Sequence, residues 1–192
     1  MAEVQTKLIT EAELMAIGSD AWVEVTNGEV VTMTAVGVLH HIIAGNVYRL
    51  LDEHVRTNRL GLLFMDGLIY ILATEGTGLR TARVPDVSFV KKESIPENWE
   101  LERPFPGAPT LAVEVISPDD EVEDILKKVR EYLDAGTEQV LVIFPKQKEV
   151  HQYRRSVSEV ATYKETGVLD LSNLIKGLTV DLAQVFAIPD LK

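Results

Sequence analysis

The chain of 192 residues contains 46% hydrophobic and 26% charged residues, a composition typical of a globular protein with one core. Its 30 acidic residues outnumber its 19 lysines and arginines, and the net charge of −11 is unfavourable for binding nucleic acid through phosphate contacts. The absence of cysteine excludes disulfides and thiolate metal sites. No apolar run reaches the roughly 18 residues that span a bilayer, and residues 1–10 show no signal-peptide pattern. We therefore expect a single domain over residues 1–192, in the cytoplasm and without membrane association.

Basic residues occur in small groups despite the net charge. The groups are Arg80 with Arg83, Lys91-Lys92, Lys127-Lys128-Arg130 and Arg154-Arg155. They could form a positive rim on an acidic body, or they could be ordinary solvated surface charges. The sequence leaves both interpretations open.

The N-terminal third predicts a short helix, a hairpin and a long helix. Thr10-Glu11-Ala12-Glu13 is a capping box, which predicts a helix that continues to about Ile17. Asn27-Gly28 predicts the turn of a hairpin between strands at 22–26 and 30–34. Apolar residues at helical spacing predict an amphipathic helix from Leu39 to about Arg56.

The segment that follows predicts several strands. Asp66-Gly67 indicates a second hairpin between strands at 62–65 and 68–73, and the glycine-containing stretch 74–82 is expected to be a loop. The apolar runs 84–90 and 111–117 predict two further strands, separated by a long segment with four prolines. A loop of that length inside a compact domain is usually functional or mobile.

The C-terminal part predicts a parallel crossover and a last hairpin. A helix is expected over 119–135, because acidic residues fill its first turn and Gly136 follows its end. It lies between apolar runs at 111–116 and 140–144, which is the arrangement of a parallel crossover. The remaining predicted elements are a strand at 140–145, a hairpin of 150–154 with 160–164, and a short helix near 181–186. The expected fold is therefore α/β (α+β), a mixed sheet with helices on its faces.

Three residues in this part of the chain indicate chemistry. Glu114 is the only ionisable residue of an apolar strand, where an unpaired charge would cost several kcal/mol, on the order of its burial penalty. Asp86 follows Pro85 at the entry to the preceding strand, and Lys128 lies at the edge of the apolar face of the helix at 119–135, whereas Lys127 is expected to point into water. Two carboxylates and a main-chain carbonyl such as that of Val115 would suit Mg²⁺ or Mn²⁺. With a lysine nearby, they indicate metal-assisted hydrolysis of a phosphodiester.

Each of the three residues also has an ordinary structural interpretation. Glu114 could be satisfied by backbone amides or by an arginine, and Asp86 could cap a turn. Lys128 could pair with Asp124, four residues earlier on the helix, for only about 0.3–0.5 kcal/mol. The functional interpretation depends on the three side chains lying together.

Several further motifs accompany these residues. They are Trp22-Val23-Glu24-Val25-Thr26-Asn27-Gly28-Glu29-Val30, His40 at the start of the long helix, Val84-Pro85-Asp86-Val87, Val113-Glu114-Val115-Ile116-Ser117-Pro118, Lys128 with Tyr132, Ala135-Gly136, and the strand from Val140 to Pro145. In this combination the sequence resembles the PD-(D/E)XK nuclease superfamily, and more closely a bacterial endonuclease family formerly described as a domain of unknown function. One departure concerns the superfamily lysine two residues after the glutamate, where Ile116 stands here. Lys128 occupies the place to which this family has moved it.

The resemblance implies a restriction-endonuclease-like core: a mixed central β-sheet flanked by helices, here with N-terminal and C-terminal β-hairpins. It implies Mg²⁺-dependent (or Mn²⁺-dependent) cleavage of DNA, with Asp86 and Glu114 as metal ligands and Lys128 assisting the attacking water. Glu24 and His40 occupy positions that this family brings to the site. Cutting both strands of a duplex calls for two sites, so we expect a homodimer. The alternative is a catalytically degenerate nuclease fold that acts as a binding or regulatory module.

Overall fold

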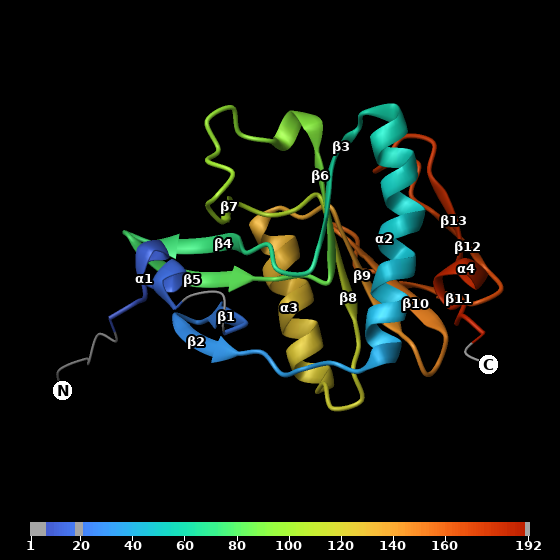
Figure 1. Cartoon of the computed structure of the whole chain (residues 1–192), viewed down its shortest axis with the longest axis horizontal. Helices are drawn as coiled ribbons and strands as arrows, with labels where there is room; N and C mark the ends of the chain where they lie inside the picture. The colour runs from blue at the N-terminus through green and yellow to red at the C-terminus, as the bar shows by residue number, and fades with distance from the viewer. Residues whose placement is uncertain (1–6, 18–20, 191–192) are drawn as a thin grey trace.

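A six-stranded mixed sheet lies at the centre of the molecule, in the computed structural model that describes residues 7–17 and 21–190 (Figure 1). In order across the sheet, its strands are β11 (Ala161–Lys164), β10 (Glu149–Arg154), β9 (Gln139–Phe144), β8 (Leu111–Val115), β6 (Val87–Lys91) and β3 (Gly61–Met65). Only the neighbours β8 and β9 are parallel, and α3 (Val122–Ala135) is the crossover between them, as the sequence predicts.

Alternation along β8 decides what lies on each face of this sheet. Leu111, Val113 and Val115 face α2 (Val38–Asn58) and belong to the largest apolar cluster of the protein. Ala112 faces α3 and packs with Ile125, Val129 and Tyr132 of that helix. Because side chains alternate along a strand, Glu114 also lies on the α3 face.

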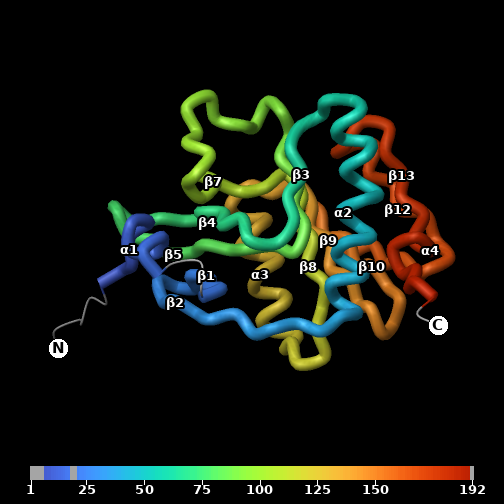
Figure 2. Tube along the Cα trace, in the orientation of Figure 1, coloured from blue at the N-terminus to red at the C-terminus, as the bar shows by residue number. Residues whose placement is uncertain are grey.

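A second sheet lies on the other side of α3 (Figure 2). Its strands, in order, are β2 (Glu29–Thr32), β1 (Val23–Thr26), β5 (Gly78–Arg83), β4 (Tyr70–Glu75) and β7 (Phe105–Pro106). The short helix α1 (Glu11–Ala16) packs on this sheet through Leu14, and Leu72 of β4 contacts the cluster around α3. The helix α3 is therefore enclosed between two sheets, and this explains why its polar edge can be buried.

The C-terminal elements cover α2. A small sheet of β12 (Val168–Asp170) and β13 (Thr179–Asp181) precedes α4 (Leu182–Val185), and a single 3-10 turn, η1 (Lys92–Ser94), follows β6. Asn46 of α2 donates hydrogen bonds to the carbonyl oxygens of Val185 (2.9 Å) and Ala187 (2.8 Å). Within the described residues, no helix is both long and apolar enough to cross a membrane.

Most of the predicted elements are confirmed. Thr10 and Glu13 form both hydrogen bonds of the capping box, and the hairpin β1–β2 turns at Asn27-Gly28. Both long helices lie where the periodicity predicts them, and Gly136 ends α3 with a φ of 117°. The C-terminal hairpin β10–β11 and the short helix α4 are also confirmed.

Two predictions between residues 62 and 82 are wrong. The strands on either side of Asp66-Gly67 are not paired with each other: β3 pairs with β6 in the central sheet, and β4 pairs with β5 in the second sheet. The stretch 74–82 is not a loop, because Gly76 (φ 59°) turns the chain within the β4–β5 hairpin. Both strands pair with other strands, β3 in the central sheet and β4 in the second sheet, and these pairings override the turn signal of Asp66-Gly67.

The predicted strand at 84–90 begins only at Val87. Residues 84–86 link β5 of one sheet to β6 of the other, and Pro85 keeps this link extended. The backbone N–H of Asp66 donates to the carbonyl oxygen of Asp86 at 3.0 Å, so β3 holds the link in place. Asp86 is thereby positioned where the two sheets meet.

A pair of glycine substitutions tests the β3–β6 contact. At Gly61 an added Cβ would lie 2.0 Å from the carbonyl oxygen of Val90, whereas at Gly45 of α2 it would meet nothing within 4 Å. We expect Gly61→Ala to destabilise the protein by about 1–3 kcal/mol or more, and Gly45→Ala to stabilise it by about 0.5–1 kcal/mol. Urea denaturation of both variants measures the effect. Equal effects at the two positions would contradict this register.

Candidate active site

A pocket of about 480 Å³ lies at the junction of the two sheets and α3. Five separate elements supply the side chains predicted from the sequence: β1 (Glu24), α2 (His40), the β5–β6 link (Asp86), β8 (Glu114) and α3 (Lys128). All five line this pocket. Residues up to 104 positions apart in the chain are in direct contact here.

Asp86 is fixed by hydrogen bonds at one of its two oxygens. Its Oδ2 accepts a hydrogen bond of 2.6 Å from the N–H of Val115, and Nε2 of His40 lies 3.2 Å from the same atom. Val115, which the sequence suggests as a carbonyl ligand, therefore contacts Asp86 through its amide. This contact ties the link between the sheets to the end of β8.

Glu114 is buried and faces α3. The hydroxyl of Tyr132 donates to its Oε1 at 2.8 Å, and Nζ of Lys128 lies 3.7 Å from its Oε2. Burial raises the pKa of Glu114 to about 7. Lys128 opposes this rise, and the charges of Asp86 and Glu24 add to it. In the absence of a further cation, negative charge at Glu114 is thus disfavoured near neutral pH.

Lys128 bridges two carboxylates at the edge of α3. Its Nζ donates to Oε1 of Glu24 at 3.2 Å and lies 3.7 Å from Glu114, while its side chain is 24% exposed to the pocket. The predicted alternative, a pair with Asp124, is not among the ion pairs of the described residues. Burial lowers the pKa of Lys128, but Glu114 and Glu24 outweigh burial and raise it. The amine is therefore a protonated ammonium at neutral pH and cannot serve as a base.

Glu24 is the central acceptor of a buried network of hydrogen bonds. Its Oε1 accepts from the N–H of Val84 (3.1 Å) as well as from Lys128, and its Oε2 accepts from Arg83 (2.6 Å). Arg83 in turn pairs with Glu131 of α3. The interpretation of Arg83 as part of a positive rim is wrong, because its side chain is only 5% exposed and is shared between two carboxylates.

His40 lies in the first turn of α2, behind Asp86. Burial lowers the pKa of His40, but the hydrogen bond and charge of Asp86 outweigh burial, and the net shift is upward. Its Nδ1 is buried and has no hydrogen-bond partner in the part of the chain that the structure describes. Asp66 lies nearby, and burial together with the charge of Asp86 raises its pKa.

The donor set fits a hard divalent cation that keeps several waters. Among the described residues, no group of three or more His, Asp or Glu side chains is arranged to hold a metal ion. Of the three carboxylates predicted for the site, Glu24 is engaged by Arg83, Lys128 and Val84, which leaves Asp86 and Glu114 as the candidate ligands. Mg²⁺ typically takes one or two carboxylates and completes its shell with water and phosphate oxygens. Burial is the largest cause of the raised pKa of Glu114, the charges of Asp86 and Glu24 add to it, and a bound cation would favour the ionised carboxylate against both.

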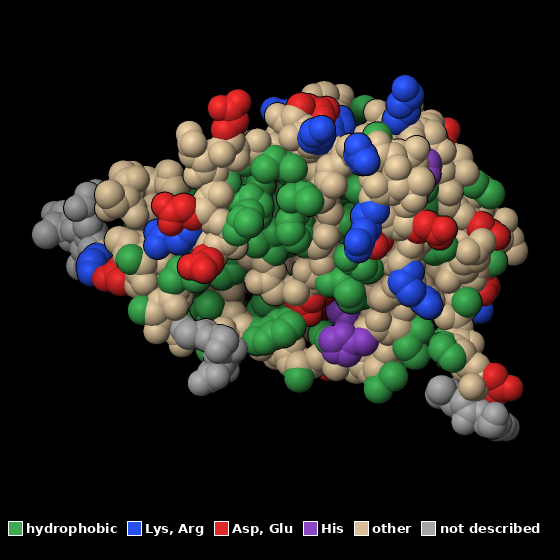
Figure 3. Space-filling view, turned by 45° about the horizontal axis from the view of Figure 1, so that its top comes forward, with side chains coloured by type: hydrophobic (Ala, Val, Ile, Leu, Met, Phe, Trp, Pro, Cys, Tyr) green, Lys and Arg blue, Asp and Glu red, His purple; other side chains and the backbone are tan. Residues whose placement is uncertain are grey.

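The lining of the pocket is acidic overall. It contains five carboxylate side chains and three from Lys and Arg, including Lys127, which was expected to point into water and is half-buried here. On the face shown in Figure 3, Lys and Arg side chains are interspersed with acidic ones, and apolar side chains gather in the middle. Arg83, Lys127 and Lys128, from two of the basic groups considered for a positive rim, line the pocket, where carboxylates outnumber them.

Sequence reasoning missed part of the network. Tyr132 belongs to the apolar cluster on α3 and its hydroxyl donates to Glu114; its position four residues after Lys128 is the signal that could have shown this contact. Arg83 and Glu131 gave no local signal. Their contact joins β5 to α3 across 48 residues of chain.

Two sheets that enclose a crossover helix agree with the restriction-endonuclease-like fold that the resemblance implies. A solved structure with this fold is described as a putative nuclease belonging to DUF820 from Anabaena variabilis ATCC 29413. It superimposes with a TM-score of 0.78 over 93% of this chain and 97% of that chain, at 22% sequence identity, a level at which the likeness is one of fold.

The family itself follows from the sequence model that matches residues 10–183. That model is Uma2, described as "putative restriction endonuclease", and the chain belongs to this family. No curated protein matches the chain at a significant level.

The raised pKa of Glu114 predicts how stability depends on pH in metal-free protein. A carboxyl whose pKa is raised on folding binds its proton more tightly in the folded state, so stability falls as the pH rises from about 4.5 to about 7. Glu114→Gln removes this loss and can still accept from Tyr132. We therefore expect the variant to be more stable than the wild type at pH 8, by roughly 1–3 kcal/mol, and the difference to shrink toward pH 5.

Urea denaturation between pH 5 and pH 8 with a chelator measures this difference. Glu123→Gln, at an exposed position of the same helix, is the matched control and should show no such trend. A Glu114→Gln variant that is less stable than the wild type at pH 8 would show that the ionised glutamate is well compensated without a metal.

Proposed function

We propose that the protein is an endodeoxyribonuclease that hydrolyses phosphodiester bonds with Mg²⁺ or Mn²⁺. The observation that carries the proposal is the convergence of Asp86, Glu114 and Lys128 from three separate elements in one pocket. Membership of the Uma2 family supports a nuclease, and the donor set supports the metal.

The residues of the site have different roles in the proposed reaction. Asp86 and Glu114, with the carbonyl of Val115 as a further oxygen donor, would hold the metal ion. When bound, the ion lowers the pKa of a coordinated water and neutralises charge on the phosphate. Lys128, which stays protonated, orients the attacking water and the phosphate by hydrogen bonds and stabilises the pentavalent transition state.

Three neighbouring side chains act by positioning. Glu24 fixes the ammonium of Lys128, Tyr132 fixes one oxygen of Glu114, and His40 fixes Asp86. Such supporting contacts determine the orientation of metal ligands and catalytic groups. We assign Glu24 and His40 to this role and not to the metal.

The proposed substrate is DNA, and we propose a cytoplasmic location because DNA is found there. Two cuts in a duplex require two active sites, so we propose a homodimer for double-strand cleavage. The acidic pocket and the net charge of −11 favour a second candidate function, a degenerate nuclease fold that acts as a binding or regulatory module.

A plasmid-nicking assay with Mg²⁺ or Mn²⁺ tests the nuclease. We expect the wild type to convert supercoiled plasmid to nicked and linear forms, Glu114→Gln to lose at least about a hundred-fold in rate, and Lys128→Ala to lose about a hundred- to a thousand-fold. The exposed positions Glu123→Gln and Arg130→Ala of α3 are the matched controls and should keep full activity. Equal activity in wild type and Glu114→Gln would assign the cleavage to a contaminant and favour the module.

Metal binding can be tested without cleavage. An ion held by Asp86 and Glu114 binds the folded state, so Mg²⁺ or Mn²⁺ at a hundred times its dissociation constant should stabilise the wild type by roughly 2.7 kcal/mol. Thermal denaturation with and without the ion measures this gain, which Asp86→Asn and Glu114→Gln should both abolish. A gain that survives in both variants would place the ion elsewhere.

A further inference from the structure

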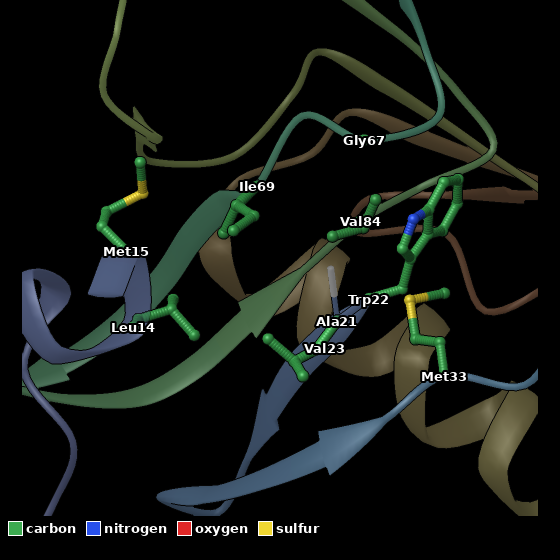
Figure 4. A pocket seen from close by; sticks show the side chains of 9 residues that line it. All are labelled: Leu14, Met15, Ala21, Trp22, Val23, Met33, Gly67, Ile69 and Val84. Atoms are coloured by element: carbon green, nitrogen blue, oxygen red, sulfur yellow. The ribbon is translucent and has the colours of Figure 1, made fainter. Parts of the chain in front are cut away.

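An uncharged pocket of about 370 Å³ lies beside the candidate active site. All of its lining residues are apolar or glycine, and they come from α1 (Leu14, Met15), the strand ends of the β1–β2 hairpin (Trp22, Met33) and the segments that lead to the two sheets (Ile69, Val84). In Figure 4 these side chains surround a common space, with Trp22 and Met33 on one flank and Leu14 and Met15 across from them. Its size is within the range of small-ligand sites.

A third pocket, of about 460 Å³, adjoins both this space and the candidate active site. It shares Asp86 with the active-site pocket, and it shares Trp22 and Met33 with the apolar pocket. The third pocket therefore lies between the charged pocket, which holds Glu114 and Lys128, and the apolar one.

Trp22 is the aromatic group of the apolar compartment. Half of its surface (50%) is exposed, and no aromatic ring contact among the described residues involves it. Its carbonyl accepts a hydrogen bond of 2.8 Å from the N–H of Met33, so the hairpin fixes the two residues side by side. A large flat side chain presented in this way beside a phosphate-processing centre is suited to stacking with a nucleobase.

We infer that the Trp22–Met33 pocket receives the base of a nucleotide next to the scissile phosphate. The inference rests on the proposed function, because that function places the phosphate at Asp86 and Glu114. A base inside a duplex stack cannot enter a pocket, so the substrate class is DNA whose base at this position is unpaired or turned out of the helix. Single strands, frayed ends and mismatched positions present such a base.

The charge of the protein agrees with this mode of binding. A body with a net charge of −11 and an acidic pocket gains little from phosphate contacts, and stacking on an aromatic side chain supplies affinity that does not depend on them. Binding to a single strand should therefore weaken only slightly as salt increases.

Fluorescence anisotropy of the full chain with a labelled single-stranded oligonucleotide, and with the same sequence as a blunt duplex, tests the inference in the presence of Ca²⁺. We expect tighter binding to the single strand. Trp22→Ala should weaken that binding by roughly five- to a hundred-fold, whereas Trp22→Phe should stay within about three-fold of the wild type. Leu101→Ala, at an exposed apolar position far along the chain, is the control and should bind as the wild type does.

Oligonucleotides with a single abasic position provide a second measurement that needs no variant. One position, next to the cut found in the cleavage assay, should reproduce the loss seen with Trp22→Ala, and positions further away should not. This result would support the inference even if Trp22→Ala failed to fold. Equal affinity for single strand and duplex, or no loss at any abasic position, would overturn it.

The binding test of the base pocket can fail or succeed independently of the cleavage test of the proposed nuclease. Plasmid cleavage that depends on Glu114, together with oligonucleotide binding that is indifferent to Trp22, would overturn the base pocket and leave the nuclease standing. Binding that depends on Trp22, without any cleavage, would support the pocket and count against the nuclease.

Discussion

Buried negative charge is the constraint on which this structure depends. Asp86, Glu114 and Glu24 lie at the junction of two sheets, each no more than about a tenth exposed, and among the described residues Lys128 and Arg83 are the lysine and arginine that form ion pairs with them. An unpaired buried charge costs several kcal/mol, on the order of its desolvation penalty, so carboxylates in such numbers are retained where they serve a purpose. The raised pKa of Glu114 marks the place where compensation is incomplete.

The fold brings these charges together by enclosing one helix. Because α3 lies between the central sheet and the second sheet, the edge that carries Lys128 and Tyr132 faces β8 while Glu131 reaches β5. The link at residues 84–86 crosses from one sheet to the other and leaves Asp86 at the point of contact. The uncharged pocket of Trp22 lies beside this junction, and a third pocket, lined by Asp86, Trp22 and Met33 among others, adjoins both the charged and the uncharged pocket.

Features with a local signal could be predicted from the sequence. Glu114 stands out as the only ionisable residue of an apolar strand, and helical periodicity places Lys128 at the edge of its helix. The crossover around α3 and the capped ends of the helices follow from similar short-range patterns. These signals were enough to indicate the class of fold and to single out Asp86, Glu114 and Lys128, whereas Glu24 and His40 were indicated by the family resemblance.

Features set by long-range pairing could not be predicted. Glu24 looks like a solvated hairpin residue until β1 pairs with β5 and buries it against Arg83. Asp66-Gly67 has the residues of a hairpin turn, but its two strands enter different sheets. The residues that line the pocket beside Trp22 are spread from residue 14 to residue 84, so no short stretch of the sequence indicates this pocket.

A crystal structure with Mn²⁺ tests the central claim most directly, because anomalous scattering locates the ion independently of any assay. The account predicts one strong manganese peak in contact with carboxylate oxygens of Asp86 and Glu114, with Glu24 still bound to Lys128 and Arg83. Manganese absent from this pocket at concentrations that occupy other sites, or bound through Glu24 with Lys128 displaced, would contradict it.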